Sequence, residues 1–159
     1  MEFLMNDGEW YVWTLVLISI LTILMMPKKN LTWAGVFITL SVGGYLAWFS
    51  NSVIGSSIDL FDLAQKKTTE FSDASLLTFV PPCIATIYVN FYNPQKGWFF
   101  AITFTLVCFV LEWLLVIVGY MENINWKTWY GIPVYFFFFK FFFPFLLRLL
   151  SKKLVKTES

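Results

Sequence analysis

Five long apolar runs constrain the fold more than any other feature of the sequence. They cover residues 10–26, 33–54, 74–92, 98–120 and 130–150. A helix rises about 1.5 Å per residue, so about 20 apolar residues suffice to cross the hydrocarbon core of a bilayer. Backbone groups in lipid must be satisfied inside the protein, and the runs are continuous rather than alternating, which favours helices. The sequence therefore predicts an all-α integral membrane bundle of five transmembrane helices, forming a single domain over residues 1–159.

Composition supports this class and excludes several others. Hydrophobic residues make up 58% and charged residues 13% of the chain, compared with about 45–50% and about 25% in soluble domains. The net charge of +1 argues against a nucleic-acid partner. Histidine is absent, and Cys83 and Cys108 both lie inside apolar runs, which excludes a disulfide framework or zinc ribbon. With no P-loop, dinucleotide fingerprint or nucleophile elbow, we expect no cofactor, no metal and no catalytic residue, and an enzyme is the less favoured interpretation.

The distribution of Lys and Arg predicts the orientation. In a chain of five spans, one side of the membrane carries most of these residues, and we expect it to be cytoplasmic. The first run lacks the basic flank and the cleavage pattern of a signal peptide, so it should remain in the mature protein. The N-terminus is then outside and the C-terminus inside, in a multi-pass cell-membrane protein. The residues on the basic side are Lys28, Lys29, Lys96, Arg148, Lys152, Lys153 and Lys156, against Lys66, Lys67 and Lys127 on the other.

Two segments are expected at the membrane surfaces. Charged and apolar residues interleave in the external connection 55–73, which suits a short interfacial helix. Asp59 and Asp62 have the spacing of paired carboxylates, but two carboxylates alone hold Ca²⁺ or Mg²⁺ poorly, so we interpret them as solubilising charge. The basic cytoplasmic tail 151–159 predicts an anchor in contact with membrane lipids, including anionic headgroups.

Two charged residues, Glu112 and Lys140, lie deep inside apolar runs, away from their ends. A charge at mid-bilayer costs about 2.5–3.5 kcal/mol on insertion scales, so such residues usually face a partner or a cavity. Glu112 precedes Tyr120 by eight residues and Lys140 follows Tyr130 by ten, so at helical rise their depths differ by only about 3 Å. The two spans are joined by a short connection and should be antiparallel neighbours. The sequence therefore predicts a Glu112–Lys140 ion pair near mid-membrane.

Adjacent prolines occur at a similar depth in the run 74–92. Each proline removes a backbone donor and disturbs the preceding helical turn, and broken helices at the midplane mark binding sites in many transporters. We therefore predict a polar ligand site in the last three spans, without a catalytic residue. Its residues are Glu112, Lys140, Pro81, Pro82, Thr78 and Trp113.

Three functions stay open at this point. The site could bind or pass a small or lipid-like ligand. The protein could instead be a structural or assembly protein whose Glu–Lys pair is purely architectural. It could also be an intramembrane enzyme acting on a lipid or isoprenoid, with Glu112 as acid, base or proton carrier. A stripe of small residues in the second run indicates close helix packing, either within the bundle or in a homodimer. The stripe is Gly35, Thr39, Gly43 and Ala47.

The C-terminal half carries a further set of sequence elements. They are Asp73, proline within the third run, Asn90-Phe-Tyr-Asn-Pro94, Trp98, Glu112, Gly119-Tyr120, Asn125-Trp126-Lys127, Trp129-Tyr130, Pro133-Val-Tyr135 and a basic end. Together, over about residues 73–150, they resemble an uncharacterised family of small multi-pass membrane proteins of endospore-forming Gram-positive bacteria. In that family proline often follows the glutamate, where this chain has Trp113. The resemblance implies a bacterial inner-membrane protein of about five spans and implies no activity.

Overall fold

The computed structural model describes residues 8–53, 61–63 and 71–151. The described chain is mostly helical, which confirms the predicted all-α class. A single two-stranded pairing occurs within it. The elements are α1 (Glu9–Met25), α2 (Trp33–Ser50), β1 (Phe61–Leu63), α3 (Phe71–Phe91), η2 (Pro94–Lys96), α4 (Gly97–Ile117), β2 (Met121–Asn123), η3 (Thr128–Tyr130), α5 (Gly131–Phe137), the π-helical turn η4 (Phe138–Phe142) and α6 (Phe143–Ser151).

Four helical segments in the described residues are long and apolar enough to cross a membrane. They are Trp33–Val53, Phe71–Phe91, Pro94–Ile117 and Thr128–Leu150. They correspond to four of the five predicted runs, so the chain has the helices of a membrane protein. α1 corresponds to the first run but has 17 residues, about 25 Å of helix.

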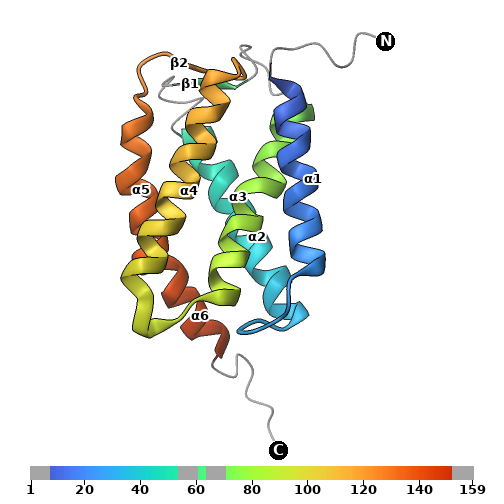
Figure 1. Cartoon of the computed structure of the whole chain (residues 1–159), viewed down its shortest axis with the longest axis vertical. Coiled ribbons are helices and arrows are strands. Elements are labelled where there is room, and N and C mark those ends of the chain that lie inside the picture. The colour runs from blue at the N-terminus through green and yellow to red at the C-terminus, as the bar shows by residue number, and fades with distance from the viewer. Residues whose placement is uncertain (1–7, 54–60, 64–70, 152–159) are drawn as a thin grey trace, which may run out of the picture.

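The helices form one bundle with α3 at its centre (Figure 1). α3 contacts α1, α2, α4 and α6, and α4 also packs along α5 and η4. In the apolar stretch of α3, 56% of residues are buried, compared with 22% in each of the other three long segments. We call the end of the bundle that carries β1, β2 and the start of α1 the strand end. The far end is the opposite end, where η2 lies.

α3 runs through Pro81 and Pro82 without a break, so the predicted broken helix is wrong. The prolines still lack N–H groups for the preceding turn, but α2 supports the helix at this level. Gly43 lies so close that a Cβ there would be 3.0 Å from the Pro82 Cα, and Trp48 Nε1 donates to Thr78 Oγ1 at 3.2 Å. Packing against α2 therefore keeps α3 continuous, although two adjacent prolines would kink an isolated helix.

The stripe of small residues on α2 faces α3. Gly35, Thr39 and Gly43 are buried, and Thr39 Oγ1 donates to the Gly35 carbonyl at 2.8 Å. Small residues let two backbones approach closely, which is how helices associate in lipid. Of the two interpretations, the contact of Gly43 with Pro82 and Ala85 of α3 shows packing within the bundle. A homodimer through Gly35, Thr39, Gly43 and Ala47 stays a prediction.

The connections at the strand end differ from the predicted ones. β1 pairs antiparallel with β2, Phe61 opposite Asn123 and Leu63 opposite Met121, so the predicted interfacial helix is wrong at residues 61–63. Residues 55–60 and 64–70 of this connection, including Asp59, and residues 152–159 of the tail lie outside the described residues, while residues 71–73 begin α3. The backbone of β2 is available for pairing because α4 has already ended before it.

The end of α4 has a specific local cause. Gly119 has φ 78°, and its N–H and that of Tyr120 donate to the carbonyls of Val116 and Leu115 at 3.1 and 3.0 Å. This is a Schellman motif, in which a left-handed glycine satisfies the last helical carbonyls. α4 therefore stops at Ile117, earlier than the predicted 120.

At the far end, one buried asparagine fastens the α1–α2 connection. Asn90 is fully buried; its Oδ1 accepts from the Lys29 N–H at 2.9 Å and its Nδ2 donates to the Pro27 carbonyl at 2.8 Å. The Asn90 carbonyl also accepts from the Asn30 N–H at 3.1 Å. The buried backbone groups of a turn thus find partners on α3.

Candidate functional site

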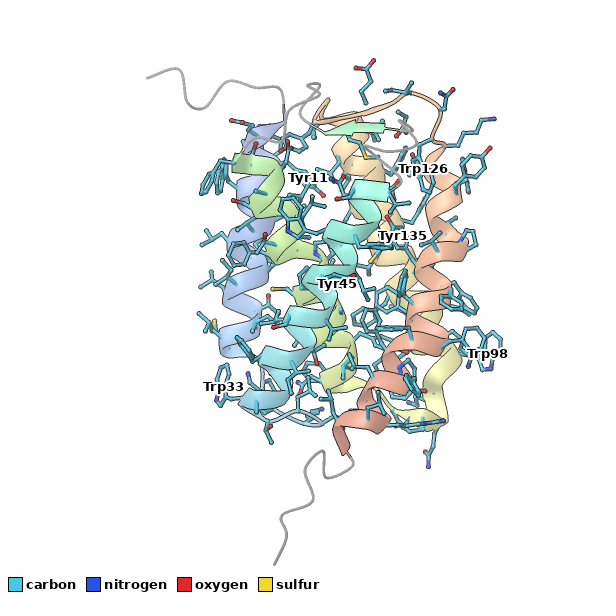
Figure 2. All side chains as sticks on the ribbon, turned by 180° about the vertical axis from the view of Figure 1, so that it is seen from behind. Tyr11, Trp33, Tyr45, Trp98, Trp126 and Tyr135 are labelled. Carbon is cyan, nitrogen blue, oxygen red and sulfur yellow. The ribbon has the colours of Figure 1, made fainter. Side chains whose placement is uncertain are left out.

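Glu112 is the central residue of the candidate site. It lies on α4, and its side chain is 8% exposed. Its Oε1 accepts a hydrogen bond from Trp126 Nε1 at 2.8 Å, and its Oε2 accepts one from the Tyr135 hydroxyl. Trp126 comes from the connection after β2 and Tyr135 from α5, and both lie toward the strand end (Figure 2). Two neutral donors from separate segments therefore hold the buried carboxyl group.

A glycine makes room for this arrangement at the start of α5. A Cβ on Gly131 would lie 2.9 Å from Glu112 Oε2 and 2.8 Å from Tyr135 Cε2. Contacts under about 3 Å displace one of the partners, so a larger residue would push the carboxyl and the phenol apart. The backbone of Gly131 is in the ordinary helical region, which any residue can adopt. Glycine is therefore needed here for space and not for its backbone conformation.

Lys140 does not meet Glu112, and the predicted ion pair is wrong. Both residues are described, and the Lys140 Nζ lies 4.0 Å from the ring centroid of Trp98, on the first turn of α4. Trp98 precedes Glu112 by 14 residues, which is about 21 Å along the helix; Figure 2 shows Trp98 toward the far end and Trp126 toward the strand end. The long lysine side chain extends to the end of the bundle, as snorkelling side chains do, and forms a cation–π contact there.

Two physical effects separate Lys140 from Glu112. The last span is not a regular helix, because Lys140 lies in the π-helical turn η4. A buried carboxyl group also does not require a cation. Neutral N–H and O–H donors satisfy a buried carboxylate with a smaller desolvation cost than a second buried charge.

Beside Glu112 is a cavity of about 260 Å³ bounded by α2, α3, α4 and α5. Its wall is mainly apolar, with Leu46, Leu76, Ile84, Leu111, Val134 and Phe138 among its residues. Polar groups lie at Ser50, Asn51, Glu112, Trp126 and Tyr135. An apolar cavity of about 150 Å³ already stays dry and binds benzene, so this larger cavity can hold part of an apolar molecule.

Of the six predicted site residues, the cavity brings together Glu112 and Pro81. Pro82 is instead buried against Gly43 of α2. Trp113 is 51% exposed on the surface of the bundle. Thr78 accepts a hydrogen bond from Trp48. Lys140 contacts the ring of Trp98.

Sequence reasoning missed the partners of Glu112. In the sequence, Trp126 and Tyr135 are elements of the family resemblance and have no predicted role at the site. Both carry one polar atom on an aromatic body, and such atoms find a hydrogen-bond partner when buried. That rule, applied to a buried Glu without a nearby cation, was the available signal. Gly131 had no signal in sequence, because its importance depends on where the carboxyl group lies.

A second polar cluster joins three segments at the strand end. Tyr120 Oη donates to Asp73 Oδ1 at 2.6 Å, and Ser72 Oγ donates to Glu9 Oε1 at 3.2 Å. All four residues are buried. Glu9 and Asp73 lie in the first turns of α1 and α3, where the helix dipole stabilises negative charge. This cluster therefore anchors the start of two helices to the turn after α4.

Comparison with protein-family models, with curated proteins and with solved structures finds no match to this chain. The resemblance of residues 73–150 to a bacterial membrane family stays a prediction. The geometry around Glu112 is therefore the basis for a functional proposal.

Proposed function

We propose that this protein resides in the cell membrane, the inner membrane of a bacterium, with five spans. α1 is the short span, and a hydrophobic segment shorter than the bilayer is accommodated by local thinning at modest cost. The far end, which carries Lys28, Lys29 and Lys96, is cytoplasmic, because basic connections stay inside. The basic tail then contacts anionic headgroups on the same side.

Reporter fusions test this topology. Fusions after Lys96 and at the C-terminus should report the cytoplasm, and a fusion between Glu122 and Lys127 should report the outside. The reverse pattern would contradict the orientation, and a cytoplasmic signal from a fusion at the N-terminus would show that α1 does not cross.

Within the membrane, we propose that the protein binds the apolar chain of a membrane amphiphile, with Glu112 as the polar anchor. The observation that carries the proposal is the cavity beside Glu112, which combines an apolar wall with one buried carboxyl group. Ligand sites are typically apolar clefts in which a few polar groups fix the orientation of the ligand. Pro81 lines the cavity and is also exposed, so a chain can enter from the surrounding lipid.

Native mass spectrometry of protein released gently from its own membrane tests the proposal. The variant Ala47→Phe places a ring in the cavity wall, and the matched control Ala34→Phe places the same ring on an exposed position of the same helix. We expect a bound mass on the wild type and on Ala34→Phe, and its loss from Ala47→Phe. An equal bound mass on all three proteins would contradict the proposal.

An architectural role is the second candidate, and one observation favours it. Both oxygens of Glu112 already accept hydrogen bonds from Trp126 and Tyr135, so the carboxyl group pins the connection after β2 and α5 to α4 without a ligand. In this case no bound mass is retained, and Glu112→Gln lowers thermal stability to the same extent in native membranes and after delipidation.

A further inference from the structure

We infer that the polar head of the bound amphiphile is a hydrogen-bond donor, with a primary ammonium preferred over a hydroxyl, and that a carboxylate head is rejected. This inference rests on the proposed function and specifies its ligand class. It follows from the hydrogen-bond capacity left at Glu112 and from the charge around the cavity.

The donors nearest to Glu112 are already used. The indole of Trp126 has one N–H, which donates to Oε1, and the Tyr135 hydroxyl donates to Oε2. A carboxylate has about four acceptor positions on its two oxygens, so acceptor positions remain after these two bonds. A ligand head that reaches the carboxyl group therefore meets acceptors and has to supply the hydrogen.

The charge around the cavity points to the same ligand class. Among the described residues that line it, Glu112 is the charged one, and none of these described residues is Lys or Arg. Lys140, the cation that the sequence suggested, contacts Trp98 at the far end instead. Like charges repel strongly in a medium of low dielectric constant, so an anionic head beside Glu112 is unfavourable and a cationic one favourable. Ser50 and Asn51, which also line the cavity, are neutral and do not offset this charge.

A cysteine in the cavity wall reports occupancy of the site. Cys108 lies one helical turn before Glu112 on α4 and lines the cavity. Cys83 is 3% exposed and is not among the lining residues. In a Cys83→Ala background, the rate at which a neutral alkylmaleimide labels Cys108 therefore measures how often the cavity is empty.

The experiment uses the full chain in phosphatidylcholine nanodiscs that contain equal mole fractions of decylamine, decanol or decanoate. The three probes share one chain length and differ in their head group. We expect decylamine to slow Cys108 labelling at least tenfold more than decanoate, with decanol between them. Glu112→Gln should abolish the difference between amine and carboxylate while decanol still protects. Lys140→Met is the matched control and should keep the wild-type order.

Each outcome distinguishes the inference from the proposed function. Equal protection by all three probes would overturn the head-group preference and leave the chain-binding proposal in place. No protection by any probe would overturn the proposed function itself. A preference that survives Glu112→Gln would overturn the role of the carboxyl group. If the maleimide fails to reach Cys108, native mass spectrometry replaces labelling, and equal retention of decylamine and decanoate overturns the inference.

Discussion

The two ends of the bundle are built from similar apolar residues, yet their buried polar groups have different hydrogen-bond partners. At the far end, rings surround Tyr88, with centroids 4.9 Å from Phe139 and 5.2 Å from Phe104. At the strand end, a carboxyl group is held by two aromatic donors beside a cavity. The described far end is occupied by packed aromatic rings, whereas the strand end combines a buried carboxyl group with a cavity.

The Tyr88 hydroxyl donates a hydrogen bond to a backbone carbonyl, and the sequence of the last span explains why this carbonyl is available. The Phe143 N–H donates to the Phe138 carbonyl in the π-helical turn. In the same register the Phe139 carbonyl would be served by residue 144, which is proline and has no N–H. The fully buried Tyr88 hydroxyl donates to that carbonyl instead. The Tyr88 hydroxyl and the Phe139 carbonyl are partners, so this hydroxyl has no hydrogen left to donate to a ligand.

The largest expected effect is at the centre of the aromatic cluster. Tyr88→Ala should destabilise the protein by about 3–5 kcal/mol, as removal of a large core side chain does. Tyr88→Phe should cost about 1–3 kcal/mol, because it strands only the Phe139 carbonyl. Tyr45→Ala, at an exposed tyrosine, is the control and should change little. Denaturant titration in detergent measures all three, and equal costs for Tyr88→Ala and Tyr45→Ala would refute the contrast.

Next in size is the loss of a donor to Glu112. Trp126→Phe keeps the ring but removes the N–H, which leaves the buried carboxyl group under-satisfied and should cost about 1–3 kcal/mol. Trp129→Phe, at an exposed tryptophan near Trp126 in sequence, is the matched control. Thermal unfolding compares the two, and an unchanged midpoint for Trp126→Phe would mean that the hydrogen bond contributes nothing.

A pair of alanines sharpens the comparison of packing. Ala101 is fully buried near the far end, whereas Ala47 lines the cavity. Overfilling a packed core costs about 1–3 kcal/mol, and filling a void does not. Ala101→Phe should therefore destabilise the delipidated protein by that amount, while Ala47→Phe should be neutral or slightly stabilising. The same cost at both positions would show that the two ends are equally packed.

The smallest effect is expected at Lys140. Lys140→Met loses a cation–π contact with the exposed Trp98, which is worth about 0.5–1 kcal/mol. Lys140→Arg should retain most of the stability, because guanidinium also stacks on indole. A loss of several kcal/mol for Lys140→Met, measured by the same unfolding assay, would indicate a buried ionic partner.

How far the sequence anticipated the molecule depends on the kind of feature. Hydropathy located the helices to within a few residues, because apolar run length reflects a bulk property. The Schellman end of α4 was not predicted: hydropathy placed the end at residue 120, because it does not register the left-handed backbone of Gly119. The continuity of α3 through Pro81 and Pro82 was not predicted either, because it depends on support from α2.

The site was predictable in part. Glu112 is recognisable in the sequence as a charge inside an apolar run, and Pro81 lines the same cavity in the structure. The partner of Glu112 was assigned by depth alone, and depth cannot specify which way a flexible side chain such as Lys140 extends. Hydrogen-bond partners such as Tyr135 depend on helix rotation, and the π-helical turn η4 changes that rotation within a uniform run of phenylalanines.

A pair of double-mutant cycles tests the central claim most directly. One cycle combines Glu112→Gln with Tyr135→Phe, and the other combines Glu112→Gln with Lys140→Met, each read out as the free energy of unfolding in detergent. Residues in contact typically couple by about 0.5–3 kcal/mol, whereas distant residues add. The account predicts coupling of about 1 kcal/mol or more in the first cycle and additivity within about 0.5 kcal/mol in the second. Coupling between Glu112 and Lys140 with additivity between Glu112 and Tyr135 would contradict it.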